Sequence, residues 1–539
     1  MSKPNMANYP SDKCFVKKIR LMQYSIIALM YFLVIVKNTE GAELFSVQSI
    51  STDGKILSAI SSDLDDNGSA EIIVLSKTGI YPKEKRWISL YRTEKSGQYL
   101  NPAWQRWEVD HTATMFEVGD IASFPGKEIF YLTGSGIRYY RQGKDGAYSR
   151  KSHRLLEFPT ITVSPVISYL PRSHLLGDWK GNNRKMLLVP QFNTLAFFDR
   201  DDDGEWRKTD TVSVTPRTFL FSDNEDDGGA FRDYSIHAEF RLPKIFMMDF
   251  NGDNLQDLIL TEQESLNVYL QKADGKFSEE PSFTNVFPVR PSGKESDVNL
   301  FYLITPVDLN GDKYVDVILT LTKGTGKFLE QEIIIYIFLN KQNLESPFTR
   351  KPDQTITANG VTPGVNIADV NADGNADLYF TKIKLGFWKI VQNLISKRVT
   401  LDTSIYLLQN DNRYPDEPDF LLKTDYKINL THKIRFRGTW PTIKSDFNKD
   451  GLKDLLVARD GKIEIFLNTL SENLFTKPFG QSGVVPSPFM QISDLNNDGF
   501  NDLLFYEKKR NGELSVLLNK GIWKNIFPSG RDKKSNNDN

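Results

Sequence analysis

A pattern of oxygen-bearing side chains occurs six times in this chain, and it restricts the fold more than any other feature. In DVNADGNADLYF, which begins at Asp369, such side chains stand at positions 1, 3, 5 and 9, and an apolar run follows at once. Every copy holds three carboxylates and one Asn at these four positions, which indicates a repeated unit with a repeated site. The other copies begin at Asp63, Asp249, Asp308, Asp446 and Asp494.

The carboxylates within each copy stand too close together to remain unpaired. Like charges repel each other, and burying them without a partner is unfavourable. Alternate positions let a curled loop direct several oxygens at one centre, and ligation by oxygen alone favours calcium over zinc or copper. Asp, Asn and Gly also form ordinary turns, which would explain one copy but not six that keep the same four positions. The pattern therefore predicts bound calcium.

Two degenerate copies lie between the first and second complete ones. The copy that begins at Asp120 keeps only Asp120 and Glu128 as candidate ligands. The copy that begins at Asp178 has Lys180 and Met186 where ligands would stand. We expect neither copy to hold a metal well.

The segments between the motifs have the alternation that is typical of β-strands. After Asp454 the chain reads LLVARDGKIEIFLN, in which Asp460-Gly461 indicates a tight hairpin turn followed by alternating apolar residues. After Asp502, Asn511-Gly512 is expected to make the corresponding turn. Each repeat thus consists of an apolar strand, the oxygen-rich loop, a second apolar strand, a hairpin, a third strand and an outer strand.

This repeat predicts an all-β fold, an eight-bladed β-propeller with one helical insertion. Counting the degenerate copies, the motifs recur at intervals of roughly 50 to 80 residues, which is the scale of a propeller blade. A seven-bladed ring, with one degenerate motif outside it, is the alternative. In the eight-bladed ring, residues 43–49 would supply the outer strand of the last blade and remove an open sheet edge.

The six loops resemble the DxDxDGxxD calcium loops of the FG-GAP/VCBS repeat family, found in integrin α-chain propellers and many secreted bacterial proteins. The resemblance extends over about residues 44–526 and includes motifs such as DLNNDGFNDLLF at Asp494. It implies up to six calcium ions, each bound by the side chains at positions 1, 3, 5 and 9 and the backbone carbonyl of position 7. The implied side-chain ligands are Asp63, Asp65, Asn67, Glu71; Asp249, Asn251, Asp253, Asp257; Asp308, Asn310, Asp312, Asp316; Asp369, Asn371, Asp373, Asp377; Asp446, Asn448, Asp450, Asp454; and Asp494, Asn496, Asp498, Asp502.

Position 6 departs from the family pattern in two loops. It is Gly in the other four, but it is Asn254 in one loop and Lys313 in another. Asn tolerates the left-handed backbone that we expect at this turn, whereas Lys adopts it at a strain cost. We therefore expect the loop at Asp308 to bind its ion less tightly.

No catalytic constellation accompanies the calcium loops. The chain has five histidines, none paired at metal-ligand spacing, and it contains no H-E-x-x-H, G-x-S-x-G or P-loop motif. We therefore expect a non-enzymatic binding or scaffold module for a protein or glycan partner, in which calcium is structural. A carbohydrate-active enzyme similar to polysaccharide lyases, or a lectin, is the alternative, because a propeller axis gathers residues from distant blades.

The N-terminus indicates export. Basic residues at Lys17, Lys18 and Arg20 precede the uncharged, mostly apolar residues 21–36, as in a secretory signal. An uncleaved signal anchor is the alternative, although such a helix, at about 1.5 Å per residue, barely reaches the roughly 30 Å of a bilayer core. We expect a periplasmic, secreted or cell-surface protein, anchored to the membrane if the signal is not cleaved. The expected segments are the signal peptide or anchor at 1–42, the propeller at 43–526 and a disordered tail at 527–539.

Two insertions interrupt the repeat. Residues 221–240 include an acidic, glycine-containing run, expected to be a solvated loop, with contact to a ligand or an extra ion as the alternative. Residues 382–402 place Leu385, Trp388 and Val391 on one face at helical spacing, close to several basic residues. This segment predicts a helix packed on the propeller, or alternatively a docking surface for a partner or a membrane.

The charge balance argues against a nucleic-acid partner. The formal net charge is −2, with 25% charged residues and no basic block. The hydrophobic content of 40% is sufficient for a large folded core.

Overall fold

The computed structural model describes most of the chain between residues 43 and 523. Among the described residues, no helix is both long enough and apolar enough to cross a membrane. The expected signal at 1–42 and the expected tail at 527–539 lie outside the described residues. Within 43–523 the residues left out are 81, 95–96, 162–169, 223–235, 290–299, 325–330, 385–392, 394, 430–434, 437, 472, 485–486, 488 and 508–510.

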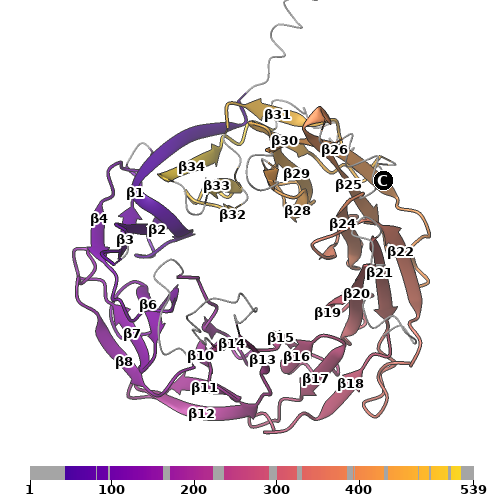
Figure 1. The fold of residues 1–539 in the computed structure, drawn as a ribbon, viewed down its shortest axis with the longest axis horizontal. Coiled ribbons are helices and arrows are strands. Elements are labelled where there is room, and N and C mark those ends of the chain that lie inside the picture. The colour runs from indigo at the N-terminus through magenta and orange to yellow at the C-terminus, as the bar shows by residue number, and fades with distance from the viewer. Residues whose placement is uncertain are drawn as a thin grey trace, which may run out of the picture.

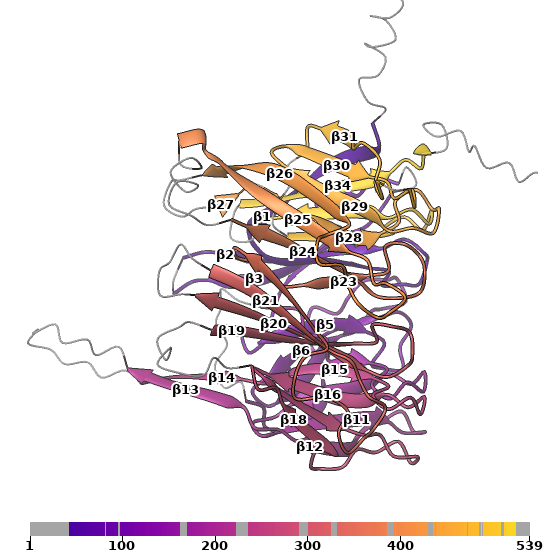
Figure 2. The ribbon, with the colours of Figure 1, turned by 90° about the vertical axis from the view of Figure 1, so that its right-hand side faces the viewer.

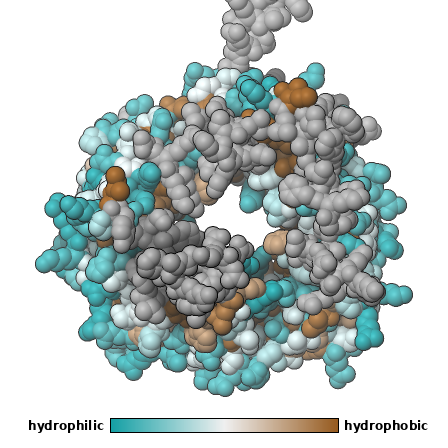
Figure 3. Space-filling view, in the orientation of Figure 1, coloured by the Kyte–Doolittle hydropathy of each residue, from teal (hydrophilic) through white to brown (hydrophobic). Residues whose placement is uncertain are grey.

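The described chain is almost entirely β-structure, arranged as antiparallel sheets in a ring (Figure 1). The all-β expectation is therefore confirmed. In most sheets the first strand along the chain lies near the centre and the last lies at the periphery (Figure 1). The space-filling view shows an opening at the centre of the ring (Figure 3).

The strands are grouped by sheet as follows. One sheet contains β5 (Met115–Gly119), β6 (Glu128–Thr133), β7 (Gly136–Tyr140) and β8 (His153–Glu157). The next contains β9 (Leu176–Gly177), β10 (Met186–Pro190), β11 (Thr194–Arg200) and β12 (Trp206–Ser213). A third contains β15 (Lys244–Met248), β16 (Asp257–Glu262), β17 (Ser265–Tyr269) and β18 (Phe283–Val286). A fourth contains β19 (Leu300–Val307), β20 (Asp316–Gly324), β21 (Gln331–Phe338) and β22 (Gln354–Asn359).

Two further sheets complete the second half of the ring. The five-stranded sheet contains β23 (Asn366–Ala368), β24 (Asp377–Ile383), β25 (Arg398–Tyr406), β26 (Phe420–Asn429) and β27 (Arg435–Phe436). The other contains β28 (Thr442–Ser445), β29 (Asp454–Arg459), β30 (Lys462–Phe466) and β31 (Phe479–Ser482).

A seven-stranded sheet joins the two ends of the described chain, in the order β32-β33-β34-β1-β2-β3-β4. The long strand β1 pairs with β34 through residues 45–51 and Lys55, and with β2 through residues 55–62. The expectation that the N-terminal stretch pairs beside the last strands is thus confirmed for residues 45–49. The strands of this sheet are β1 (Phe45–Ser62), β2 (Glu71–Thr78), β3 (Lys85–Tyr91), β4 (Gln105–Glu108), β32 (Phe489–Ser493), β33 (Asp502–Tyr506) and β34 (Asn511–Asn519).

The hydrophobic core lies between neighbouring sheets. One cluster joins Leu75 of β2 to Ile129 of β6, and another joins Leu456 of β29 to Leu503 of β33, and all four side chains are buried. Full burial of such a side chain contributes roughly 1.5–3 kcal/mol. Apolar contact between the sheets therefore holds the ring together, and it leaves the loops at the strand ends free to carry polar groups.

One expected hairpin turn is wrong. Asn511 and Gly512 lie inside β34 rather than at a turn, and Asn511 pairs with β1. A Cβ at Gly512 would lie 1.9 Å from Thr52 Oγ1, so this glycine permits the close approach of β1 rather than a turn. The other expected turn is confirmed, with φ of 50° at Asp460 and 83° at Gly461.

The first insertion contains more regular structure than expected, and the second is described only in part. β13 (Arg217–Ser222) and β14 (Ile236–Arg241) form a two-stranded ribbon that extends away from the ring (Figure 2). The expected solvated loop at 221–240 therefore begins and ends as strand, because the chain pairs with itself. In the second insertion Ile395 and Ser396 are helical, while Leu385, Trp388 and Val391 lie outside the described residues.

Candidate metal centres

Each of the six oxygen-rich loops connects a first strand to a second strand, and position 9 is the first residue of that second strand. The strand thus fixes position 9, while the turn carries positions 1 to 5. The position-9 residues are Glu71 of β2, Asp257 of β16, Asp316 of β20, Asp377 of β24, Asp454 of β29 and Asp502 of β33.

The carboxylate at position 1 caps the turn. Asp249 Oδ1 accepts hydrogen bonds from the backbone N–H groups of Gly252 (2.8 Å) and Asp253 (3.1 Å), and its Oδ2 accepts one from Asn254 (2.7 Å). Each carboxylate oxygen has two lone pairs, so this capping leaves acceptor capacity for a cation. The N–H of position 6 donates in the same way to Asp63, Asp308, Asp369, Asp446 and Asp494.

The expected left-handed backbone at position 6 is confirmed. Asn254 has φ of 67° and Lys313 has φ of 70°, close to the glycines of the other loops. Position 4 is left-handed as well, which the sequence reasoning missed; examples are Asp66 at 55° and Ala372 at 58°. The two left-handed residues curl the loop so that its alternate side chains converge.

The side chains at positions 3 and 5 contact each other in five of the loops. Asn371 Nδ2 donates to Asp373 Oδ2 (2.9 Å), and Asp373 Oδ1 accepts from the N–H of position 7 (2.8 Å). The Asn amide therefore orients the position-5 carboxylate. The same amide-to-carboxylate contact is made by Asn251, Asn310, Asn448 and Asn496.

The carboxylate at position 9 is buried and links three parts of its sheet. In the loop at Asp446, Asp454 Oδ2 accepts from the N–H of Phe447 at position 2 (2.7 Å), and its Oδ1 accepts from the N–H of Asn468, just after the third strand (2.9 Å). All five position-9 aspartates are fully buried. Burial raises the pKa of Asp316, Asp454 and Asp502 to about 7 and that of Asp257 and Asp377 to about 6, although the backbone hydrogen bonds act in the opposite direction.

Calcium fits this donor set. The loops offer carboxylate, amide and carbonyl oxygens, which a hard divalent cation prefers. Buried carboxylates with raised pKa values lack a stabilising charge, and two ligand oxygens, Asp494 Oδ1 and Asp65 Oδ1, are buried without a hydrogen-bond partner. A cation at the centre of such a loop would supply the charge, and in the Asp494 loop it would also supply the missing partner.

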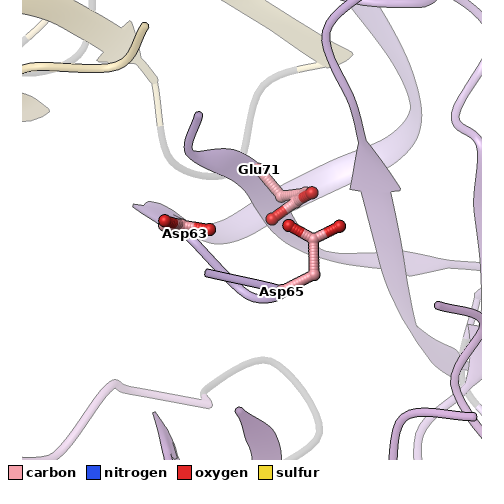
Figure 4. A group of neighbouring side chains, drawn as sticks. All are labelled: Asp63, Asp65 and Glu71. Carbon is pink, nitrogen blue, oxygen red and sulfur yellow. The ribbon is translucent and has the colours of Figure 1, made fainter. Parts of the chain in front are cut away.

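The Asp63 loop has a different geometry from the other five. Its three carboxylates, on Asp63, Asp65 and Glu71, have oxygens within 4.8 Å of one another (Figure 4), and within the described residues no other loop brings three carboxylates this close. Its Asn stands at position 5 and accepts from the N–H of Ser69 (2.7 Å). Glu71 Oε2 accepts from the N–H of Leu64 (2.8 Å), as the aspartates do elsewhere.

One degenerate loop keeps the capped turn although part of its ligand set is missing. In the loop at Asp178, the N–H groups of Asn182 (3.0 Å) and Asn183 (2.8 Å) donate to Asp178, so the capped turn persists. Position 9 of this loop is Met186, which is buried and offers no oxygen. The capped turn is therefore formed without a complete set of ligands.

Neighbouring loops are hydrogen-bonded to one another, which the sequence reasoning also missed. The N–H of Ala70, at position 8, donates to the carbonyl of Leu495, at position 2 of the loop at Asp494 (2.9 Å). Asn519, the last residue of β34, donates from Nδ2 to the Phe447 carbonyl of the preceding loop (3.0 Å). The recurring Leu-Asn pair at the end of the third strand is the sequence signal that could have revealed this contact. The other such asparagines are Asn340 and Asn468.

Comparison with known proteins identifies the repeat. The FG-GAP-like repeat matches residues 249–319, 308–380 and 446–505. No curated protein matches the chain. Among solved structures, a protein from Lactobacillus plantarum is 10% identical, with 78% of this chain and 96% of that one covered and a TM-score of 0.30. Sqt1 from Chaetomium thermophilum is 9% identical, with 89% and 99% covered and a TM-score of 0.39.

Proposed function

The chain contains three FG-GAP-like repeats, and we propose that it is an exported, calcium-stabilised β-propeller of eight blades that acts as a binding or scaffold module. The observation that carries the proposal is the shared loop geometry. The capped turn, the left-handed positions 4 and 6 and the buried position-9 carboxylate recur in loops that are far apart in the sequence.

Eight blades, rather than seven, are supported by the strand pairing. Both degenerate motifs stand between two strands of a sheet: Glu128 begins β6 and Met186 begins β10, so neither motif falls outside the sheets. The seven-stranded sheet supplies a first and a last blade that share β1. The remaining sheets, apart from the β13–β14 ribbon, supply one blade each.

A structural role for calcium is supported by where the ligands lie. The position-9 carboxylate connects the loop to the third strand, so an ion bound there would join three segments of one blade. Each site would stabilise the fold by RT ln(1 + [L]/Kd), about 2.7 kcal/mol when free calcium is 100 times Kd. Several such sites suit an extracytoplasmic space, where calcium is plentiful.

Calcium removal tests the structural part of the proposal. We expect chelation to lower the melting temperature by several degrees or more, and calcium, but not magnesium, to restore it. Metal content measured on the desalted protein should be several calcium ions per chain. Unchanged melting and no bound calcium would contradict the proposal.

The binding part is tested by a glycan-binding screen, followed by a product assay on any glycan that binds. Binding without turnover supports a lectin-like module, while no binding points to a protein partner. Turnover of a bound glycan would overturn the non-enzymatic assignment.

A further inference from the structure

The Asp63 loop lies next to a fixed positive charge. Arg92 follows β3, and its Nε lies 3.3 Å from Glu71 Oε1 while one terminal nitrogen lies 3.6 Å from Asp65 Oδ2. Asp65 and Glu71 are positions 3 and 9 of the loop. In the described part of the chain, no side-chain cation forms an ion pair with a candidate ligand of the other five loops.

The strand register shows that this arginine replaces a leucine. Ile72 pairs with Tyr91, and in the other five blades the residue after position 9 pairs in the same way with a residue at or near the end of the third strand: Tyr269, Phe338, Tyr406, Phe466 and Leu517. The next residue is Arg92 in the Asp63 blade and leucine in the other five, so the substitution coincides with the unusual loop. These leucines are Leu270, Leu339, Leu407, Leu467 and Leu518.

Two sequence differences within the Asp63 loop bring carboxylates close to the Arg92 guanidinium. Exchange of Asn and Asp between positions 3 and 5 places the carboxylate of Asp65 beside the guanidinium, whereas the other loops have an Asn amide there. Glutamate at position 9 is one methylene longer than aspartate, which brings Glu71 Oε1 within ion-pair distance of Arg92 Nε, although the two atoms form no hydrogen bond. In the other loops this second oxygen accepts a backbone N–H at or just beyond the end of the third strand, as at Asp454 and Asp502.

Groups outside the loop hold the guanidinium in place. It stacks over the Trp104 ring at 3.7 Å from the centroid and donates to the carbonyl of Gly146 (3.3 Å). A Cβ at Gly146 would lie 2.9 Å from an Arg92 nitrogen, so a side chain at this position would displace the guanidinium. A second cation, Lys127 Nζ, lies 3.0 Å from Asp66 Oδ1 of the same loop.

We propose that the Asp63 loop holds the Arg92 guanidinium in place of calcium, and that the protein binds five calcium ions at the other five loops. A dication entering the Asp63 loop would meet like-charge repulsion from a guanidinium that Trp104 and Gly146 keep there. The first blade is thereby independent of calcium. This inference rests on the proposed function, because it assumes that the five leucine-flanked loops bind calcium.

Counting ions by native mass spectrometry of the calcium-saturated full chain tests the proposal. We expect five ions in the wild type, five in Asp65→Asn and four in Asp373→Asn, which changes the position-5 ligand of a leucine-flanked loop. Six ions in the wild type, or the loss of one in Asp65→Asn, would overturn the inference alone. No bound calcium at all would instead overturn the proposed function.

The reciprocal variant is Arg92→Leu, which restores the residue of the other blades and should raise the count to six. Arg141→Leu is the matched control, because Tyr140 pairs with Ile129 and places Arg141 at the same position beside the degenerate Asp120 loop. Its count should remain five. A folded Arg92→Leu protein that still binds five ions would contradict the proposal; if this variant does not fold, the Asp65→Asn count decides.

Hydrogen exchange gives an independent readout on the wild type. Chelation should reduce amide protection of β24 and β25 by at least tenfold and leave β2 and β3 within twofold of their protection in calcium. Equal loss of protection in both blades would contradict the calcium independence of the first blade.

Discussion

The buried aspartates at position 9 should bind protons more tightly in the folded protein without a cation and less tightly with one. Each accepts at least two backbone hydrogen bonds, yet burial raises its pKa to about 6 or 7. In the folded protein without calcium these carboxyls therefore bind protons more tightly than in the unfolded chain. A bound calcium ion reverses this preference, because it stabilises the ionised form.

The pH dependence of stability should change sign with calcium. From near pH 4, the ordinary pKa of aspartic acid, to about pH 7, the calcium-depleted protein should lose stability as pH rises, on the order of 1–3 kcal/mol per position-9 group. In saturating calcium these groups should contribute increasing stability over the same range. Thermal unfolding of depleted and saturated protein at pH 5 and pH 7.5 measures the difference, and parallel pH profiles would contradict the prediction.

Replacing the position-1 aspartate in two different loops should distinguish the stability that comes from the capped turn from the stability that comes from the bound ion. Asp369→Ala and Asp178→Ala each remove a carboxylate that accepts backbone N–H groups, at a cost of roughly 1 kcal/mol as for other caps. Only Asp369→Ala should also remove one calcium ion and lose further stability in calcium. Metal content and melting in calcium and in chelator check this, and equal effects of the two variants would count against calcium at the Asp369 loop.

At the scale of the element, the loop depends on two left-handed residues. Lys313 has φ of 70° at position 6, where four loops have glycine. For a residue with a Cβ this conformation costs roughly 1–2 kcal/mol. The Asp308 loop therefore folds with backbone strain that the glycine loops avoid.

Lys313→Gly should relieve that strain. We expect calcium affinity at the Asp308 loop to rise about five- to tenfold, as the relief of roughly 1 kcal/mol or more implies. Gly374→Lys is the matched control: a Cβ there meets no atom within 4 Å, so backbone strain alone should lower affinity by a similar factor. Calcium titration calorimetry measures both, and unchanged affinities would show that position 6 does not limit binding.

The loops and strands were predictable because their signals are local. Alternating oxygens and the apolar run after Asp369 lie within a few residues of each other, and so do Asp460 and Gly461. Asn511-Gly512 resembles that turn in sequence, but its neighbour across the sheet is Thr52, which no local pattern identifies. Arg92 was missed for the same reason, since only the strand register places it beside Glu71.

At the scale of the whole molecule, the ring depends on the contact between β1 and β34. Residues 45–51 pair with the last strand, and Gln481 of β31 hydrogen-bonds the N–H (2.7 Å) and the carbonyl (3.0 Å) of Phe45. Without this contact β34 would present an open edge, the usual template for pairing with another chain.

Gly512→Val should weaken the closure. Its Cβ would collide with Thr52, so we expect a loss of about 2 kcal/mol or more, and self-association through the freed edge. Gly480→Val on the outer strand β31 is the control, because a Cβ there lies no closer than 3.9 Å to any atom. Melting curves and light scattering measure both effects. Normal stability and a monomeric Gly512→Val protein would show that the closure tolerates the added side chain.

The sharing of β1 also determines when the protein completes its fold during synthesis. Ser49 and Glu513, whose side chains hydrogen-bond across the closure, are 464 residues apart. At about 5–20 residues per second, the N-terminal half of β1 waits roughly half a minute to a minute and a half before its partner leaves the ribosome. Throughout that interval the nascent chain carries an unpaired strand at its leading end, and a chaperone that covers this strand would prevent two growing chains from closing on each other.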